Sequence, residues 1–200
     1  GLFGPSVSIS ADGAIIAGGG PDGDRGYVEA YRRNGLTWEI FGQRLEADDG
    51  DTNRFGFSLD LSASGLTLVI GAPSNVEGGG EIGNGGMVRL LDYDEDMEMW
   101  LPVAPDLLAL TPDDETGYAV SMSSNGRTIV VARPGLNSLR GRVQTYRWNS
   151  VEWIQTGRDV EDSAAADSTD EWGRSVTMSS NSNRIAVGTA ADFVQVFEIQ

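Results

Sequence analysis

The residues best suited to chemistry in this sequence are carboxylates, since it contains 30 acidic and only 14 basic residues. Fourteen of the acids fall in three segments, residues 46–53, 106–115 and 159–171, which contain no basic residue. Such a concentration of negative charge attracts basic protein surfaces or divalent cations. The candidate partner-binding residues are therefore Asp48, Asp49, Asp51, Asp113, Asp114, Glu115, Asp167, Asp170 and Glu171, together with Asp22 and Asp24 of a neighbouring loop. The alternative interpretation is a set of solvated loops that keeps the protein soluble.

Two patterns of alternating acids have the spacing of cation ligands. Asp92, Asp94 and Asp96 are the candidate ligands of a cation site in one turn. Asp49, Asp51 and Asn53 begin the spacing of a calcium loop, but Arg54 stands where such a loop needs glycine. A glycine-rich nucleotide pattern at residues 78–83 has no helix after it to receive a pyrophosphate. We therefore predict no cofactor, and no metal beyond the first candidate.

Composition excludes several classes of function. The sequence contains no Cys, no His and, because all 14 basic residues are Arg, no Lys. Disulfides, thiolate nucleophiles, Cys/His zinc sites, His-based triads and Schiff-base lysines are therefore impossible. The formal charge of −16 argues against a nucleic acid partner or an anionic membrane. No apolar run approaches the roughly 20 residues of a membrane span, so any membrane association is expected through partners.

The elements that must position these acids are found in an internal repeat. Four segments, Phe3–Ser10, Phe55–Ser62, Thr116–Ser123 and Trp172–Ser179, share a glycine at their second position and then alternate small polar with apolar residues. Alternation of this kind is typical of strands. A turn and two further apolar segments follow in each copy, and the first three copies add a segment that contains one tryptophan (Trp38, Trp100 or Trp153).

A unit of four antiparallel strands that recurs every 50 to 60 residues predicts an all-β fold, a β-propeller of about four blades. We expect one propeller or propeller segment over residues 1–200, with blades at about 1–45, 53–107, 116–160 and 171–200, the last without its outer strand. The chain is then either a four-bladed ring or, as we favour, an arc of a longer propeller. The only helix expected is a short turn in each of two segments, residues 106–110 and 159–170.

The repeat resembles the FG-GAP family of β-propellers, which includes the integrin head. Phe55-Gly56 followed by Gly71-Ala72-Pro73 is the fullest match, Phe3-Gly4 and Trp172-Gly173 keep the first half, and Thr116-Gly117 loses the aromatic residue. The resemblance implies an extracytoplasmic adhesion or binding protein, secreted, periplasmic or in an organelle lumen. It does not imply calcium, because short turns such as Ser10–Gly13 replace the Asp-rich loop of many members.

Binding residues concentrate on loops that a rigid scaffold holds, so we expect function at the end of the propeller that carries the long acidic loops. The first hypothesis is a non-catalytic interaction module, a structural subunit that docks on a larger assembly through this face. The alternative is an extracellular adhesion or ligand-binding domain for a glycan or surface protein, with a weak dependence on cations. A glycoside hydrolase is a remote third alternative, because it needs paired carboxylates and the expected inner strands offer only Asp60. We therefore do not expect an enzyme.

Overall fold

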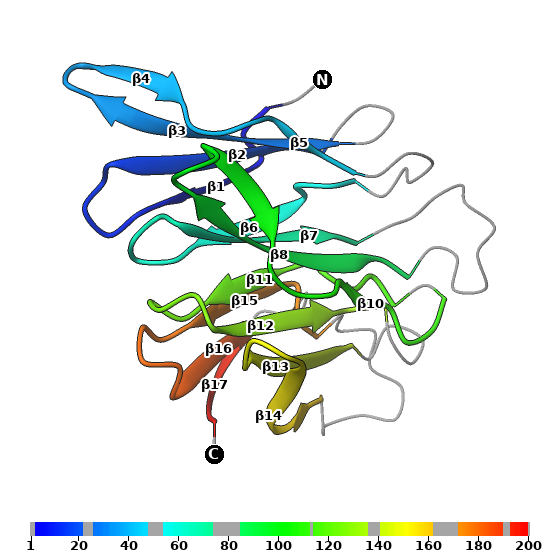
Figure 1. Ribbon diagram of the computed structural model, residues 1–200. Coiled ribbons are helices and arrows are strands. Elements are labelled where there is room, and N and C mark those ends of the chain that lie inside the picture. Colours follow the sequence, from blue (N-terminus) through cyan, green and yellow to red (C-terminus); the bar gives the residue numbers. More distant parts are fainter. Residues whose placement is uncertain are drawn as a thin grey trace.

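The computed structural model describes residues 3–21, 26–47, 54–73, 85–112, 114–135, 141–161, 172–189 and 193–199. These residues form four antiparallel sheets and no helix, arranged as four successive blades of a β-propeller (Figure 1). The predicted fold class is thus confirmed. None of the described residues belongs to a helix long and apolar enough to cross a membrane.

Each blade begins with a short inner strand and proceeds outward. The first blade contains β1 (Ser6–Ile9), β2 (Ile15–Gly20), β3 (Tyr27–Asn34), β4 (Thr37–Ile40) and β5 (Leu45–Glu46). The second contains β6 (Ser58–Leu61), β7 (Thr67–Ala72), β8 (Met87–Asp94), β9 (Met99–Pro102) and β10 (Leu107–Leu108). The third contains β11 (Val120–Met122), β12 (Thr128–Arg133), β13 (Arg142–Trp148) and β14 (Trp153–Val160), and the fourth contains β15 (Ser175–Met178), β16 (Arg184–Gly188) and β17 (Val194–Glu198).

The outer strand of the first two blades is split in two, which the sequence did not predict. β4 and β5 both pair with β3, and β9 and β10 both pair with β8. The helical turn expected at residues 106–110 is therefore wrong. Leu107 and Leu108 lie opposite Val88 and Met87, so the sheet, rather than a helix, pairs with their backbone.

A polar side chain closes the turn between the first two strands of every blade. In the first blade the Ser10 hydroxyl accepts the Ile15 N–H at 2.9 Å and donates to Asp12 at 2.6 Å. Asp12 also accepts the Ala14 N–H at 2.9 Å. The hydrogen bond from Ser10 is the main cause that lowers the pKa of the exposed Asp12 carboxyl. The later blades repeat this pattern with the pairs Ser62 and Ser64, Ser123 and Asn125, and Ser179 and Asn181.

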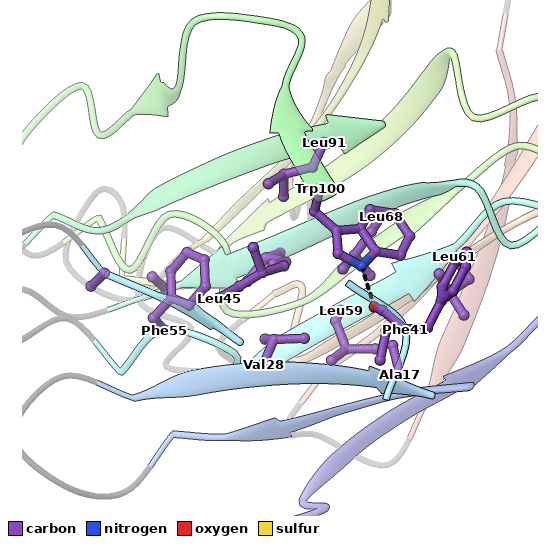
Figure 2. Packing of buried hydrophobic residues seen from close by; sticks show 14 of the residues in the cluster. Ala17, Val28, Phe41, Leu45, Phe55, Leu59, Leu61, Leu68, Leu91 and Trp100 are labelled. Carbon is purple, nitrogen blue, oxygen red and sulfur yellow. Dashed lines mark hydrogen bonds between the residues drawn. The ribbon is translucent and has the colours of Figure 1, made fainter. Parts of the chain in front are cut away.

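Buried apolar side chains lie between the blades, not within them. Three clusters fill the three junctions between consecutive blades. Figure 2 shows the first cluster, in which Val28 and Phe41 of the first blade pack against Leu59, Leu68 and Trp100 of the second. A single blade cannot bury both of its faces, so its stability depends on its neighbours.

The aromatic-glycine pair at the start of the second repeat packs closely against the first blade. Phe55 is buried, and a parallel bridge joins it to Gly26 of the preceding blade. Gly56 adopts a φ of +84°, and a Cβ there would lie 2.6 Å from the Tyr27 carbonyl oxygen. Only glycine allows both the left-handed conformation and this close approach. The pair of Phe55 and Gly56 thus has a packing role.

Candidate functional site

The inner strands meet around one carboxylate, Asp60 on β6. Its Oδ1 accepts the Ser8 hydroxyl of the first blade at 2.9 Å and the Leu61 N–H at 3.0 Å. Its Oδ2 accepts the Ser121 hydroxyl and the Met122 N–H of the third blade, both at 2.9 Å. Asp60 therefore links three blades, and its lone pairs are directed at four donors of the scaffold. This geometry suits a structural bridge and not a nucleophile or general base.

Three described acids at the loop-bearing end, Asp106, Asp159 and Glu161, pair with arginines from the strands. Arg89 on β8 forms a two-point contact with Asp106, with Nη2 at 2.8 Å from Oδ2. Arg142 on β13 lies 3.1 Å from Asp159 and donates from Nε to Glu161 at 2.6 Å. Sequence reasoning missed these pairs because the acidic segments themselves contain no basic residue. The arginines come from strands of the same blades, 17 residues before Asp106 and 19 residues before Glu161.

A buried ion pair lies at the same end. Asp114 accepts the Leu110 N–H at 2.7 Å and the Thr111 hydroxyl at 2.6 Å, and Arg133 Nη1 lies 3.2 Å from its Oδ2. Both side chains of the pair are almost completely buried. Arg133 takes the position that Ala72 of the Gly-Ala-Pro sequence holds in the second blade. The pair anchors the loop before the third blade.

The structure places only two of the eleven candidate partner-binding acids. Asp114 faces the interior, so its carboxylate is not presented to a partner, while Glu115 is half-buried with a left-handed φ of 56°. The remaining candidates lie outside the described residues, namely Asp22, Asp24, Asp48, Asp49, Asp51, Asp113, Asp167, Asp170 and Glu171.

The candidate cation ligands do not form a site. Asp92 accepts the Thr67 hydroxyl at 2.7 Å and pairs with Arg127 at 3.2 Å. Asp94 accepts the backbone N–H groups of Asp96 and Met97, which closes a turn. Within the described part of the chain, no group of three or more acidic side chains is placed to hold a metal ion. The alternation of these three acids reflects a strand end and a turn.

The first and the last blade both expose apolar side chains. The sequence analysis did not identify these side chains as a candidate site. Inner strands β1, β6, β11 and β15 pack in that order. Val7 and Ile9 of the first blade and Val194 and Val196 of the fourth are exposed. The first and fourth blades thus each leave one apolar face exposed.

Comparison with known proteins supports the fold alone. A protein of unknown function from Desulfotomaculum acetoxidans DSM 771 matches with a TM-score of 0.61 and 13% identity, over 96% of this chain and 50% of that chain. A hydrazine synthase from Kuenenia stuttgartiensis matches with a TM-score of 0.61 and 12% identity, over 96% of this chain and 57% of that chain. The chain thus spans about half the length of these structures. No family model and no curated protein matches it.

Proposed function

We propose that this chain is a non-catalytic β-propeller module that binds a protein partner through the end that carries the acidic loops. The arginines Arg44, Arg89, Arg133 and Arg142 at this end already pair with acids of the scaffold. They therefore cannot also offset the charge of the other loop acids, and that end is left strongly negative for a basic partner. This pairing is the observation that carries the proposal. The proposal includes that the chain is a structural subunit of a larger assembly.

The non-catalytic role is supported by how the carboxylates are used. Asp60 is committed to four scaffold donors, and Asp106, Asp114 and Asp159 are held by arginines. A hydrolase needs carboxylates that are free to exchange protons or attack substrate. These described acids instead hold strands and loops in place.

We also propose that the repeat is of the FG-GAP type and that the protein works in an extracytoplasmic compartment. Phe55 and Gly56 at one junction and Trp172 and Gly173 at another show why an aromatic-glycine pair recurs. The compartment follows from the resemblance and is tested by protease protection of the tagged protein in intact cells.

The partner is tested by affinity capture at low salt with two variants of equal charge change. One variant carries Asp48→Asn, Asp49→Asn and Asp51→Asn in an acidic loop. The control carries Glu95→Gln, Asp96→Asn and Glu98→Gln, in the turn between β8 and β9 at the opposite end. A stoichiometric partner should stay with the control and be lost from the loop variant. Equal loss from both variants, or no partner at all, would contradict the proposed function.

A further inference from the structure

The sulfur groups of this chain are all thioethers, because the sequence contains five methionines and no cysteine. The methionines fall into two sets that differ in exposure. Met97 and Met99 are 63% and 40% exposed. The other three, Met87, Met122 and Met178, are 7%, 5% and 8% exposed. A thioether at the surface meets dissolved oxidants directly, whereas a buried one meets them only when the structure opens locally.

The three buried methionines lie one in each junction between blades. Met87 belongs to the cluster of the first junction, Met122 to that of the second and Met178 to that of the third. Oxidation converts the flexible, apolar side chain of methionine into a polar sulfoxide, which disrupts a packed core. Because each blade depends on its neighbours, a sulfoxide in any junction should destabilise the folded chain.

The two exposed methionines lie together in one hairpin, at the end of the blades opposite the acidic loops. Met97 is in the turn between β8 and β9, and Met99 is the first residue of β9. Neither side chain belongs to any of the three junction clusters. A sulfoxide at either position would therefore be hydrated and would disturb none of these clusters.

The backbone of this hairpin is held in place on both sides of the turn. The Asp94 carboxylate accepts the Asp96 N–H at 3.0 Å and the Met97 N–H at 2.9 Å. Glu98, which separates the two methionines, adopts a left-handed φ of 53°, and Met99 then pairs with Asp94 in the sheet. The two thioethers are therefore exposed on an ordered element, and an oxidant reaches them without any unfolding.

We propose that Met97 and Met99 are a site of reversible oxidation that consumes hydrogen peroxide before the junction methionines react. The thioether sulfur attacks one oxygen of the peroxide, and the O–O bond breaks. The other oxygen leaves as hydroxide and takes the proton of the transferred oxygen, so the products are a sulfoxide and water. Sulfur loses two electrons and the peroxide gains them. A methionine sulfoxide reductase can then restore the thioether.

Graded treatment with hydrogen peroxide, followed by peptide mass spectrometry, tests the order of reaction. In the folded chain, Met97 and Met99 should be oxidised at least about tenfold faster than the three junction methionines, because the latter react only after local opening. In concentrated urea all five should react at similar rates, which attributes the order to the fold. Equal rates in the folded chain would overturn the inference.

A double variant tests whether the hairpin protects the junctions. Each chain receives two molecules of peroxide, and the reaction runs until the peroxide is consumed. The wild type should keep its unfolding temperature, since both oxygen atoms go to the hairpin. Met97→Leu combined with Met99→Leu keeps the hairpin apolar but removes its thioethers. The same dose should then oxidise Met87, Met122 or Met178 and lower the unfolding temperature, and an equal fall in both proteins would overturn the inference.

Leu108→Val combined with Leu110→Val is the matched control, because these leucines are 56% and 58% exposed and their replacement removes no sulfur. This variant should respond to peroxide like the wild type, and a loss of protection equal to that of the methionine variant would contradict the inference. Methionine sulfoxide reductase should return the oxidised wild type to its original mass, and a failure to do so would overturn reversibility. None of these results bears on the proposed function, whose variants lie in an acidic loop.

Discussion

At the scale of single residues, one side chain distinguishes the second blade from its neighbours. Asp60 stands where the other inner strands have Ser8, Ser121 and Thr177. Ser8 and Ser121 each accept one N–H of the following blade. Asp60 does the same and also accepts two hydroxyl hydrogen bonds, one from the preceding blade and one from the following blade. Carboxylate acceptors make stronger hydrogen bonds than neutral ones. Asp60 should therefore contribute more to stability than its counterparts.

Replacement of Asp60 tests that contribution. Asp60→Ala should lower the free energy of unfolding by about 2–4 kcal/mol, because it leaves the Met122 N–H and two hydroxyls without their acceptor. Asp60→Ser should cost less, since the hydroxyl found in the neighbouring blades can still accept the Met122 N–H. Urea denaturation followed by tryptophan fluorescence measures both values. Equal stability of the two variants would contradict the bridging role.

The buried pair of Asp114 and Arg133 gives a second prediction at this scale. Asp114→Asn should cost about 3–5 kcal/mol, because the buried guanidinium loses its counter-charge. Glu198→Gln is the control, since it breaks the pair with Arg184 in which both side chains are mostly exposed, and it should change stability by at most about 1 kcal/mol. Denaturation at neutral pH compares the two, and similar losses would show that burial does not set the value.

The Tyr146 hydroxyl should make the free energy of unfolding fall as pH rises into the alkaline range. Burial is the main cause that raises the pKa of its hydroxyl above the ordinary value of about 10. The folded state therefore keeps the proton longer than the unfolded state, so this stabilisation is full below about pH 10 and is lost as pH rises through the folded pKa. Tyr146→Phe keeps the ring that packs on Trp153 and should lose stability less steeply above pH 10. Identical slopes in alkaline denaturation would contradict this expectation.

At the scale of elements, the breaks in the split outer strands provide carbonyl groups that accept hydrogen bonds from the next blade. Where the outer strand of the first blade breaks, the Phe41 carbonyl accepts the indole N–H of Trp100 at 2.9 Å. The break in the second blade offers the Pro105 carbonyl to Trp153 at 2.8 Å. Trp100 and Trp153 therefore both pack and donate across a junction. Trp38 of the first blade is exposed because no described blade precedes it.

The repeat glycines offer a matched test of how closely the blades approach. Gly4 and Gly56 have similar φ values of +94° and +84°, but a Cβ at Gly4 would meet nothing within 4 Å. Gly4→Ala should cost about 1–2 kcal/mol from backbone strain alone. Gly56→Ala should cost about 1–3 kcal/mol more, because the added methyl group meets the Tyr27 carbonyl. Thermal denaturation of dilute protein measures both, and equal losses would contradict the role of the close approach.

At the scale of the whole molecule, a charge of −16 opposes both folding and association. Several described acids pair with arginines, yet the total remains strongly negative because the chain has only 14 basic residues. Long-range repulsion between like charges is screened by salt. The short, partly buried ion pairs are screened less.

Salt should therefore stabilise the folded chain. We expect the unfolding temperature to rise as sodium chloride increases from about 0.01 M to 0.15 M, over which the screening length falls from about 30 Å to 8 Å. Sodium sulfate would also act through preferential exclusion, so chloride is the better choice. A fall in unfolding temperature over this range would show that the ion pairs outweigh the net repulsion.

The sequence by itself determined the all-β fold class and the four-bladed propeller arrangement, because the alternation of small and apolar residues is a local signal. Only the tertiary structure decided which acids are neutralised, since Arg89 and Arg142 reach them from other strands. It likewise decided that Asp114 is buried and that two blade faces stay open. Pairing and burial depend on contacts between distant segments, which no spacing along the chain records.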